Sequence, residues 1–489
     1  MIRIYLDWNI VSNFKKPEFS EIREFIAEHK DYLQFPFTPA HFKDLMKSYQ
    51  PDNNLFDVDL ENLEYLSEKH LLQWGKDNIE IFSATPKEYL EREKNNEDIF
   101  SAMDFEKIVN ELDSFDFGGK IGTLFKSILE SCSAGIQITD ENREILNIML
   151  PNISNESSMW DLVKDITPFA KQLHQDGIYY KELRKTINDK GFKLNKNSGN
   201  WEVTDVIKNI DDYLIKMKVS QNFCEYIDSC FKHKKEPANR YEYYTTAYLM
   251  LDMMGYKSDK LKKASNNMQN IQTDGEHSFY SAYCDYFVVM DKNLKTKTEV
   301  LFNKFNIPTI VISPNELIDT LKSKIHIPDT NIHFLIEASS IIRDGEVVEK
   351  QDIDENGVKA FVIQLPVFYF NFFNYAIYQY SPEHNISMLT FKRVFKNYSN
   401  FIFYTESEKL IDRICLFFGS NNDEDFAEKK REFVYGENKV EFFWKLDGVF
   451  IKLQKDEETL RPILTYYYIL ASDEKSIEKT TQKLPKGKS

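Results

Sequence analysis

The sequence contains little cysteine, with five in 489 residues. No two of them form a Cys-x-x-Cys pair, and their positions are Cys132, Cys224, Cys230, Cys284 and Cys415. This spacing argues against both a zinc knuckle and a disulfide framework. A few scattered thiols are typical of a reducing compartment, so we expect the protein in the cytoplasm.

Long apolar runs without polar residues are also missing. Residues 360–380 form the one uncharged stretch long enough to span a bilayer, but glutamine, proline and asparagine interrupt it. Each helical turn there would carry a polar group into lipid. We therefore predict a buried strand followed by a buried helix, and no membrane partner. The N-terminus reaches Asp7 too soon for the apolar region of a secretory signal.

Positive charge is scarce relative to negative charge. The chain has 62 Lys and Arg against 78 Asp and Glu, a formal net charge of −16. A protein that binds nucleic acid through phosphate contacts alone needs clustered cationic charge, so this class of nucleic-acid-binding protein is excluded. An acidic protein can still act on nucleic acid where bound divalent metals supply positive charge. A phosphate-binding loop is absent as well, because the Gly-Lys at 119–120 lacks that motif's spacing.

Alternating strand and helix signals are present at the start of the chain and again after residue 240. The apolar runs 2–6 and 286–290 are typical of strands buried on both faces. Thr38-Pro39 and Ser313-Pro314 each place a capping residue before a proline at the first helical position. Strand and helix in alternation predict a parallel sheet flanked by helices, which is an α/β fold.

The length suggests about three domains at roughly 150 residues each. Helical patterns such as residues 60–73 dominate the middle of the chain, and alternating strand patterns return after about residue 325. We therefore predict a split α/β domain over 1–50 and 240–325, a helical insertion over 51–239, an α+β domain over 326–480 and a basic disordered tail over 481–489.

Four aspartates stand out by their positions. Asp7 follows the first predicted strand, and Asp291 follows the strand at 286–290. In an open parallel sheet ligands bind beyond the carboxyl ends of the strands, so both side chains should reach one crevice. Asp44 lies in the helix that begins at Thr38-Pro39, and Asp274 is predicted to open the helix before the second strand. Crowded carboxylates repel each other, and Mg²⁺ or Mn²⁺ relieves that repulsion with hard oxygen ligands.

Three segments resemble the PIN-domain nucleases. Residues 4–11 (IYLDWNIV) resemble the opening strand of that family, an apolar run followed by Asp, any residue, and Asn or Ser. Residues 274–291 resemble its closing half, and residues 37–44 resemble the helix that carries its second acidic residue. The resemblance covers about residues 1–50 and 240–325. It implies a PIN-like fold split by a long insertion.

The same resemblance implies the chemistry. It makes Asp7, Asp44, Asp274 and Asp291 the catalytic, metal-binding carboxylates for Mg²⁺ or Mn²⁺. The implied activity is an endonuclease that hydrolyses phosphodiester bonds, with RNA as the favoured substrate. A toxin-like or antiviral, phage-defence role is an implication of the resemblance alone.

Several polar residues flank these aspartates. His277 lies one turn after Asp274, and we assign it to the catalytic set. Asn9, His41, Lys292 and Lys295 are assigned to substrate binding. The alternative interpretations give these residues structural roles. The histidines could be buried with their hydrogen bonds satisfied, and the lysines could belong to a solvent-exposed helix face. Asp274 could be an N-cap, and Asp44 could be solvated near its neighbouring lysines. Glu276 is expected to face solvent.

Two other functions stay open. The chain could be a non-catalytic interaction or scaffold protein that retains a PIN-like fold, or a small-molecule phosphohydrolase on a similar sheet. The C-terminal domain carries no chemistry that the sequence reveals. It could gate access, bind substrate or mediate assembly, either as a homo-oligomer or with a regulatory partner.

Overall fold

The computed structural model describes most of the chain. The residues that it does not describe are 48–54, 94–125, 128, 141, 176, 188, 190–193, 195–197, 233–235, 259–267, 327–337, 339, 341–342, 352–358, 382–385, 420–424, 447–448 and 470–489. The Gly-Lys at 119–120 and the predicted tail therefore lie outside the described residues.

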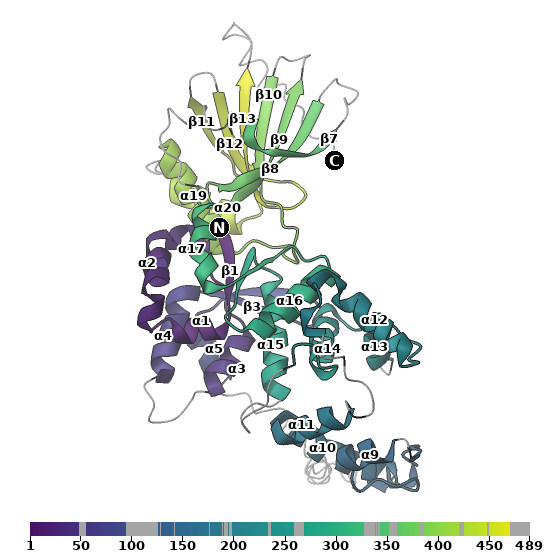
Figure 1. Ribbon diagram of the computed structural model, residues 1–489. Helices are drawn as coiled ribbons and strands as arrows, with labels where there is room; N and C mark the ends of the chain where they lie inside the picture. The colour runs from purple at the N-terminus through teal and green to yellow at the C-terminus, as the bar shows by residue number, and fades with distance from the viewer. Residues whose placement is uncertain are drawn as a thin grey trace.

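The first sheet has four parallel strands in the order β2-β1-β5-β6. They are β1 (Ile2–Leu6), β2 (Leu33–Gln34), β5 (Tyr286–Val288) and β6 (Ile310–Ile312). β1 pairs with β2 on one side and with β5 on the other, so two segments far apart in the sequence lie side by side. Figure 1 shows helices around this sheet. The prediction of a parallel sheet flanked by helices is confirmed.

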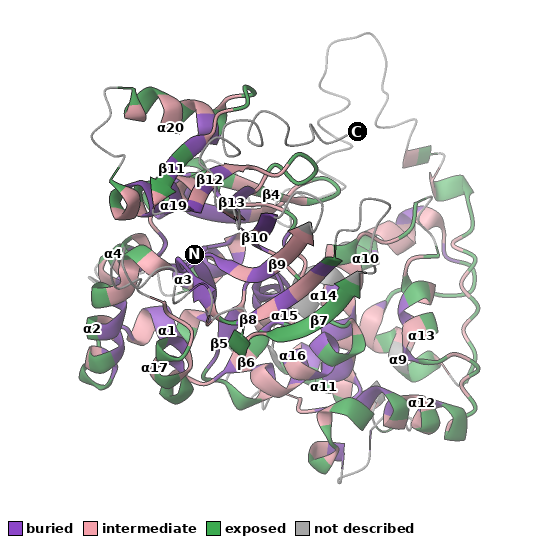
Figure 2. Cartoon of the chain, turned by 90° about the horizontal axis from the view of Figure 1, so that it is seen from above, coloured by how far each residue is buried: buried purple, intermediate pink, exposed green. Residues whose placement is uncertain are grey.

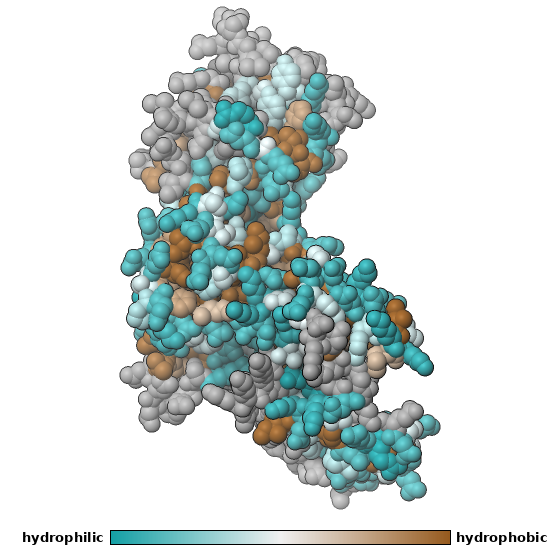
Figure 3. Space-filling model, in the orientation of Figure 1, coloured by the Kyte–Doolittle hydropathy of each residue, from teal (hydrophilic) through white to brown (hydrophobic). Residues whose placement is uncertain are grey.

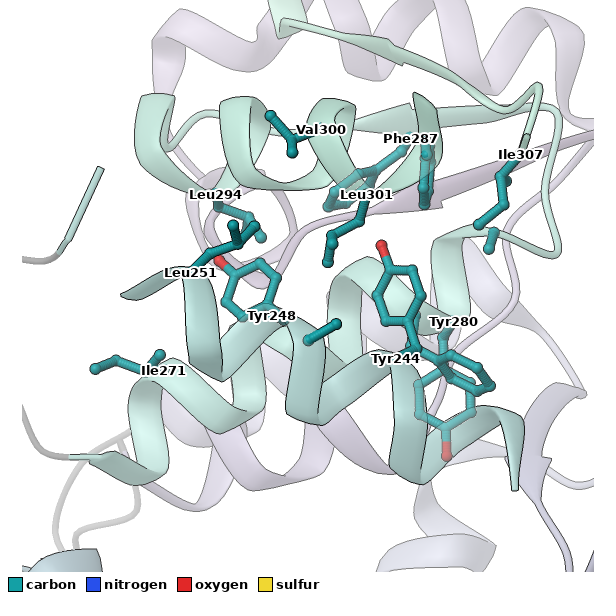
Figure 4. Close-up of a cluster of buried hydrophobic side chains, with 14 of the residues drawn as sticks. Tyr244, Tyr248, Leu251, Ile271, Tyr280, Phe287, Leu294, Val300, Leu301 and Ile307 are labelled. Atoms are coloured by element: carbon teal, nitrogen blue, oxygen red, sulfur yellow. The ribbon is translucent and has the colours of Figure 1, made fainter. Parts of the chain in front are cut away.

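Each face of this sheet has its own core, because side chains alternate along the strands. Tyr5 and Phe287 pack with α14, α15 and α16, and Figure 4 shows Phe287 among the side chains of these helices. Ile4 and Val288 pack on the other face with α1, α2, α4 and α17. Figure 2 shows the buried positions concentrated in the strands and on the inward sides of the helices. The bounds are α1 (Trp8–Asn13), α2 (Ser20–His29), α3 (Pro39–Lys47), α4 (Leu55–Ser67), α14 (Arg240–Met253), α15 (Met268–Ser281), α16 (Lys292–Lys304) and α17 (Pro314–Lys322).

The predicted helical insertion also contains a β-hairpin. The helix expected over 60–73 ends at Ser67, because Glu68 adopts a left-handed conformation with φ 53°. The chain continues as β3 (His70–Trp74), which pairs with β4 (Ile79–Ser83) and makes a parallel bridge from Leu71 to Phe37. The helices of this block are α5 (Pro86–Glu93), α9 (Arg143–Met149), α10 (Met159–Gln175), α11 (Gly177–Ile187), α12 (Val206–Lys216) and α13 (Phe223–Cys230). Short 3₁₀ helices occur at Pro17–Phe19, Lys30–Tyr32, Ser198–Asn200 and Val203–Asp205.

A separate antiparallel sheet follows, with seven strands in the order β11-β12-β13-β10-β9-β8-β7. The strands are β7 (Glu346–Gln351), β8 (Lys359–Tyr369), β9 (Phe373–Ser381), β10 (Ile386–Lys392), β11 (Phe442–Leu446), β12 (Val449–Lys455) and β13 (Pro462–Ile469). Helices α19 (Tyr404–Phe418) and α20 (Phe426–Tyr435) pack against it through a shared apolar core. In Figure 1 this sheet stands above the first one.

The stretch 360–380 does not contain the predicted helix. It forms the hairpin of β8 and β9, in which Tyr369 pairs with Phe373. The chain reverses at Phe370 and Asn371, whose φ angles are 50° and 52°. Asparagine tolerates this left-handed conformation, and the turn directs a second strand back along the first. Within the described residues, none of the helices is both long enough and apolar enough to cross a bilayer.

Buried ion pairs join the two sheets. Arg3 in β1 places its Nη2 2.6 Å from Oε2 of Glu406 in α19, and the two side chains are 1% and 0% exposed. Arg3 Nη2 also donates to the carbonyl of Phe401 at 2.8 Å. Burial raises the pKa of Glu406, but the charge of Arg3 and its hydrogen bonds outweigh burial and bring the pKa to about 2. Glu406 is therefore ionised in the folded protein and holds α19 against β1.

Replacing Glu406 with Gln should destabilise the protein by about 3–5 kcal/mol at pH 7, because Arg3 would stay buried without a counter-charge. The folded-state pKa lies below the ordinary value of 4.5. The contribution of Glu406 is thus present above pH 4.5 and is lost as the pH falls toward 2. Urea unfolding of both proteins across this range measures the difference. Glu428→Gln, at an exposed position of α20, is the control, and equal stability of the two variants would contradict the prediction.

Candidate active site

The candidate site lies at the carboxyl ends of β1 and β5. Asp7 directly follows β1, and its backbone N–H donates to the carbonyl of Val288 at 3.0 Å. Asp291 comes after β5 and caps α16, since its Oδ1 accepts from the N–H groups of Asn293 and Leu294 at 2.7 and 2.9 Å. Neighbouring parallel strands end at the same edge of a sheet, so the two aspartates share that edge.

Asp7 is a buried carboxylate, with 2% of its surface exposed. Its pKa is raised to about 6. Burial is the largest cause, and the charges of Asp44 and Asp291 raise the pKa further, whereas His277 and the hydrogen bond from Asn9 lower it. The three aspartates therefore influence one another electrostatically, as expected for acidic groups gathered at one edge.

Asp44 in α3 is held by two partners. Its Oδ2 lies 3.0 Å from Nε2 of His277, and its Oδ1 accepts from Nζ of Lys47 at 2.6 Å. Burial raises the pKa of Asp44, but His277 and Lys47 together lower it below its ordinary value. Asp44 is thus ionised and engaged with His277, rather than solvated as in the alternative interpretation.

A chain of hydrogen bonds runs from β1 through α15 to α3. The hydroxyl of Tyr5 lies 2.8 Å from Nδ1 of His277, whose Nε2 faces Asp44. The Tyr5 hydroxyl also lies 2.8 Å from Oγ1 of Thr38. His277 is fully buried. Sequence reasoning missed Tyr5, although its position two residues before Asp7 places both side chains on the same face of the strand.

Both ring nitrogens of His41, which we predicted to bind substrate, have partners inside the protein. It is buried, its Nε2 lies 2.9 Å from the carbonyl of Leu6, and its Nδ1 accepts from the N–H of Thr38 at 3.1 Å. Burial lowers the pKa of His41 to about 3, so the ring is neutral. His41 supports the end of β1, and contact of its nitrogens with a substrate would require these bonds to break.

Helix α15 begins at Met268, so Asp274 lies inside it and does not open it. The prediction that Asp274 opens this helix is therefore wrong, and so is the alternative that it serves as the N-cap. Asp274 is half-buried. Glu276 was expected in solvent but is 1% exposed. Its carboxylate accepts from Nζ of Lys43 at 2.6 Å and from the hydroxyl of Tyr241 at 2.8 Å, because α15 packs between α3 and α14.

The remaining predicted residues lie near the rim. Asn9 is exposed, and its Nδ2 donates to Oδ2 of Asp7 at 3.1 Å. Lys292 is exposed at the first position of α16. Nζ of Lys295 lies 3.5 Å from Oε2 of Glu316. Among these three, Asn9 bonds the carboxylate of a predicted metal-binding aspartate, whereas the backbone N–H of Lys295 donates to the backbone carbonyl of Asp291 at 2.9 Å.

The four predicted aspartates do not form one preassembled ligand set. Among the described residues, no three His, Cys, Asp or Glu side chains come together as a group that could hold a metal ion. The contacts explain this, because Asp44 is turned toward His277 and Lys47, and Asp291 uses one oxygen to cap α16. Asp7 and the other oxygen of Asp291 remain as hard oxygen donors. One hydrated divalent cation needs no more than one or two carboxylates, so this donor pair fits Mg²⁺ or Mn²⁺.

Comparisons of the chain with models of protein families, with curated proteins and with solved structures found no match.

Replacing Asp7 with Asn should stabilise the metal-free protein. The folded-state pKa of about 6 lies above the ordinary 3.8, so ionised Asp7 opposes folding above pH 6. The penalty disappears as the pH falls through 6 toward 3.8. A shift of about two units corresponds to about 3 kcal/mol. Asp7→Asn should therefore raise the free energy of unfolding by up to about 3 kcal/mol at pH 8 and by little at pH 4.

Urea unfolding in EDTA at both pH values measures this effect. The control is Asp140→Asn, because the side chain of Asp140 is fully exposed. A loss of stability in Asp7→Asn at pH 8, with Asp140→Asn unchanged, would show that the Asp7 charge supports the fold instead of opposing it.

Proposed function

We propose that the protein is a metal-dependent endonuclease with a PIN-like fold, which hydrolyses phosphodiester bonds and acts on RNA. The observation that carries the proposal is the buried Asp7, whose pKa is raised to about 6 by burial and by Asp44 and Asp291. A carboxylate in this setting is costly unless a cation joins it. Perturbed carboxylates at the carboxyl edge of a parallel sheet are typical of functional sites.

Asp7 and Asp291 would hold Mg²⁺ or Mn²⁺ through carboxylate oxygens, and Asn9 would orient Asp7 through the hydrogen bond at 3.1 Å. When bound, such a cation supplies a water of lowered pKa and stabilises negative charge on a phosphodiester. The exposed Lys292 at the start of α16 lies next to Asp291, where it can attract a phosphate backbone.

His277 acts in this proposal as a positioning residue for Asp44. Its Nδ1 lies 2.8 Å from the Tyr5 hydroxyl and its Nε2 lies 3.0 Å from Oδ2 of Asp44, so the ring is held between these two groups. This arrangement keeps the Asp44 carboxylate in a fixed orientation near Asp7. Asp44 then adds negative potential that favours a cation at Asp7, even though its own oxygens face His277 and Lys47.

The preference for RNA and a toxin-like or phage-defence role rest on the resemblance of residues 1–50 and 240–325 to PIN-domain nucleases. The net charge of −16 agrees with a nuclease that depends on metal, rather than on a broad basic face, to approach a polyanion. The antiparallel sheet would then serve substrate access or assembly.

Nuclease activity is tested with labelled RNA, single-stranded DNA and duplex DNA in Mg²⁺, Mn²⁺ or EDTA. We expect RNA cleavage that requires the metal and falls at least about 100-fold in Asp7→Asn, because a ligand is lost. Asp140→Asn should cleave like the unchanged protein. Release of phosphate from free nucleotides alone would indicate a phosphohydrolase. No turnover, with no rise of melting temperature on adding metal, would indicate an interaction protein.

The role of the hydrogen-bond chain is tested by Tyr5→Phe. This change keeps the ring that packs on Phe287 but removes the hydroxyl that bonds His277. We expect kcat to fall by about tenfold with little change in KM, because the ring of His277 and the Asp44 carboxylate lose their fixed orientation. Steady-state cleavage kinetics measure both constants.

Tyr256→Phe is the matched control. Tyr256 is as deeply buried as Tyr5, and its hydroxyl makes no hydrogen bond to any of the described residues. An equal decrease of kcat in both variants would mean that loss of a buried hydroxyl, and not the contact with His277, lowers activity.

A further inference from the structure

The antiparallel sheet ends in two strands of different character, β7 and β11. β7 has a bulge between Val347 and Glu349 and contains three charged residues. Bulges and charged side chains are features that keep an edge strand from pairing with other chains. β11 pairs with β12 over Phe442–Leu446 without a bulge and contains one charged residue, Lys445. β11 is therefore the edge that is better suited to accept another strand.

The position of β11 leaves room for such a strand. Among the described residues, β12 is the one strand that pairs with β11. Figure 1 shows β11 at one margin of its sheet, and in Figure 3 the outline of the molecule narrows below this sheet. β11 thus lies away from the parallel sheet and its helices.

The two faces of β11 have different surroundings. Phe442 and Trp444 pack into the core that the sheet shares with α19 and α20. Phe443 and Lys445 alternate with them, so they lie on the other face. Phe443 is 62% exposed, and Lys445 is exposed as well. The end strand therefore presents an exposed aromatic ring and an exposed cation beside its backbone edge.

The ladder between β11 and β12 matches each of these side chains with its counterpart. Phe443 lies opposite Lys452, and Lys445 lies opposite Phe450. Nζ of Lys452 is 5.4 Å from the ring centroid of Phe443, and Nζ of Lys445 is 5.6 Å from that of Phe450. An ammonium group at this distance is attracted by the face of an aromatic ring. Two such pairs of phenylalanine and lysine help to select β12 as the partner of β11.

β11 and β12 follow the same pattern of residues. β11 has the sequence FFWKL over 442–446, and the segment of β12 that pairs with it has the sequence VFIKL over 449–453. In both, the first, third and fifth residues are apolar, the second is phenylalanine and the fourth is lysine. An antiparallel alignment places the second residue of one strand opposite the fourth of the other. The β11 strand of a second copy therefore offers β11 the same pairs that β12 offers.

We propose that β11 pairs antiparallel with β11 of a second copy of this chain, about a two-fold axis at Trp444. Phe443 of each copy then lies opposite Lys445 of the other, and the two antiparallel sheets join into one. The interface is closed, because the same strand serves on both sides of the axis. A lysine on an edge strand ordinarily disfavours pairing with another chain, but here each lysine meets an aromatic ring. The proposal does not depend on the nuclease function, which concerns the other sheet.

The oligomeric state of the full chain is measured by size-exclusion chromatography with multi-angle light scattering over a range of protein concentrations. We expect the mass to rise with concentration to twice that of one chain. A mass of one chain at every concentration would overturn the proposal. A mass that exceeds two chains would overturn it as well, because a two-fold interface closes at the dimer.

Phe443→Lys tests whether β11 forms the interface. The new lysine would lie opposite Lys445 of the second copy, and like charges directly opposite each other destabilise a strand pair. We expect the dissociation constant of the dimer to rise at least about tenfold. The control is Ile215→Lys, since Ile215 in α12 is 69% exposed and should leave the dimer unchanged. An unchanged dimer in Phe443→Lys, or an equal loss in the control, would overturn the proposal.

The register is tested by mixing two variants, Phe443→Lys and Lys445→Glu. Each variant alone loses both cross-copy pairs of phenylalanine and lysine, so each should dimerise weakly. In a mixed dimer the new lysine of one copy lies opposite the new glutamate of the other, and one original pair is retained. We therefore expect the equimolar mixture to recover the dimer, which also shows that both variants are folded. A mixture that dimerises no better than the separate variants would rule out this pairing of strands.

Discussion

The parallel pairing of β1 with β5 is the contact on which the rest of the structure depends. Leu6 lies in register with Val288, and the Asp7 N–H continues the ladder to the Val288 carbonyl. A shift of one residue would turn Tyr5 and Asp7 to the other face of the sheet, away from His277. β5 spans Tyr286–Val288 alone, so its register is held mainly by side chains packed on both faces.

Charge compensation separates three acidic groups that are paired with a cationic side chain from Asp7. Glu406, Asp285 and Glu276 are buried or half-buried, and each faces an arginine or lysine at hydrogen-bond distance. Asp7 accepts from the neutral amide of Asn9 instead, and two other aspartates raise its pKa. A fold that needed Asp7 only for stability would be better served by an uncharged residue there. This contrast distinguishes Asp7 from the three paired carboxylates of the same chain.

Local patterns in the sequence were sufficient to predict the parallel sheet, because short apolar runs mark the strands and prolines mark the starts of helices. They also located Asp7 and Asp291, whose positions follow directly from the ends of strands. Asp274 was misplaced because nothing in its neighbourhood indicates that α15 begins at Met268. Tyr5 and Glu276 acquire their partners from α15, α3 and α14, and such contacts between distant segments leave no trace in local periodicity. The β8–β9 hairpin was mistaken for strand and helix because its turn contains Phe370 and Asn371 rather than glycine.

The same short strand has an aspartate beyond each of its two ends. Asp285 with its arginine partners precedes β5, and Asp291 follows it. At about 3.3 Å per residue, the six steps between them span at most about 20 Å. At the first end, Nη2 of Arg393 lies 2.6 Å from Oδ2 of Asp285 and compensates its charge. At the other end, Asp291 accepts from backbone N–H groups and the neighbouring Asp7 accepts from the amide of Asn9, so the acidic groups at the two ends of β5 differ in their charge compensation.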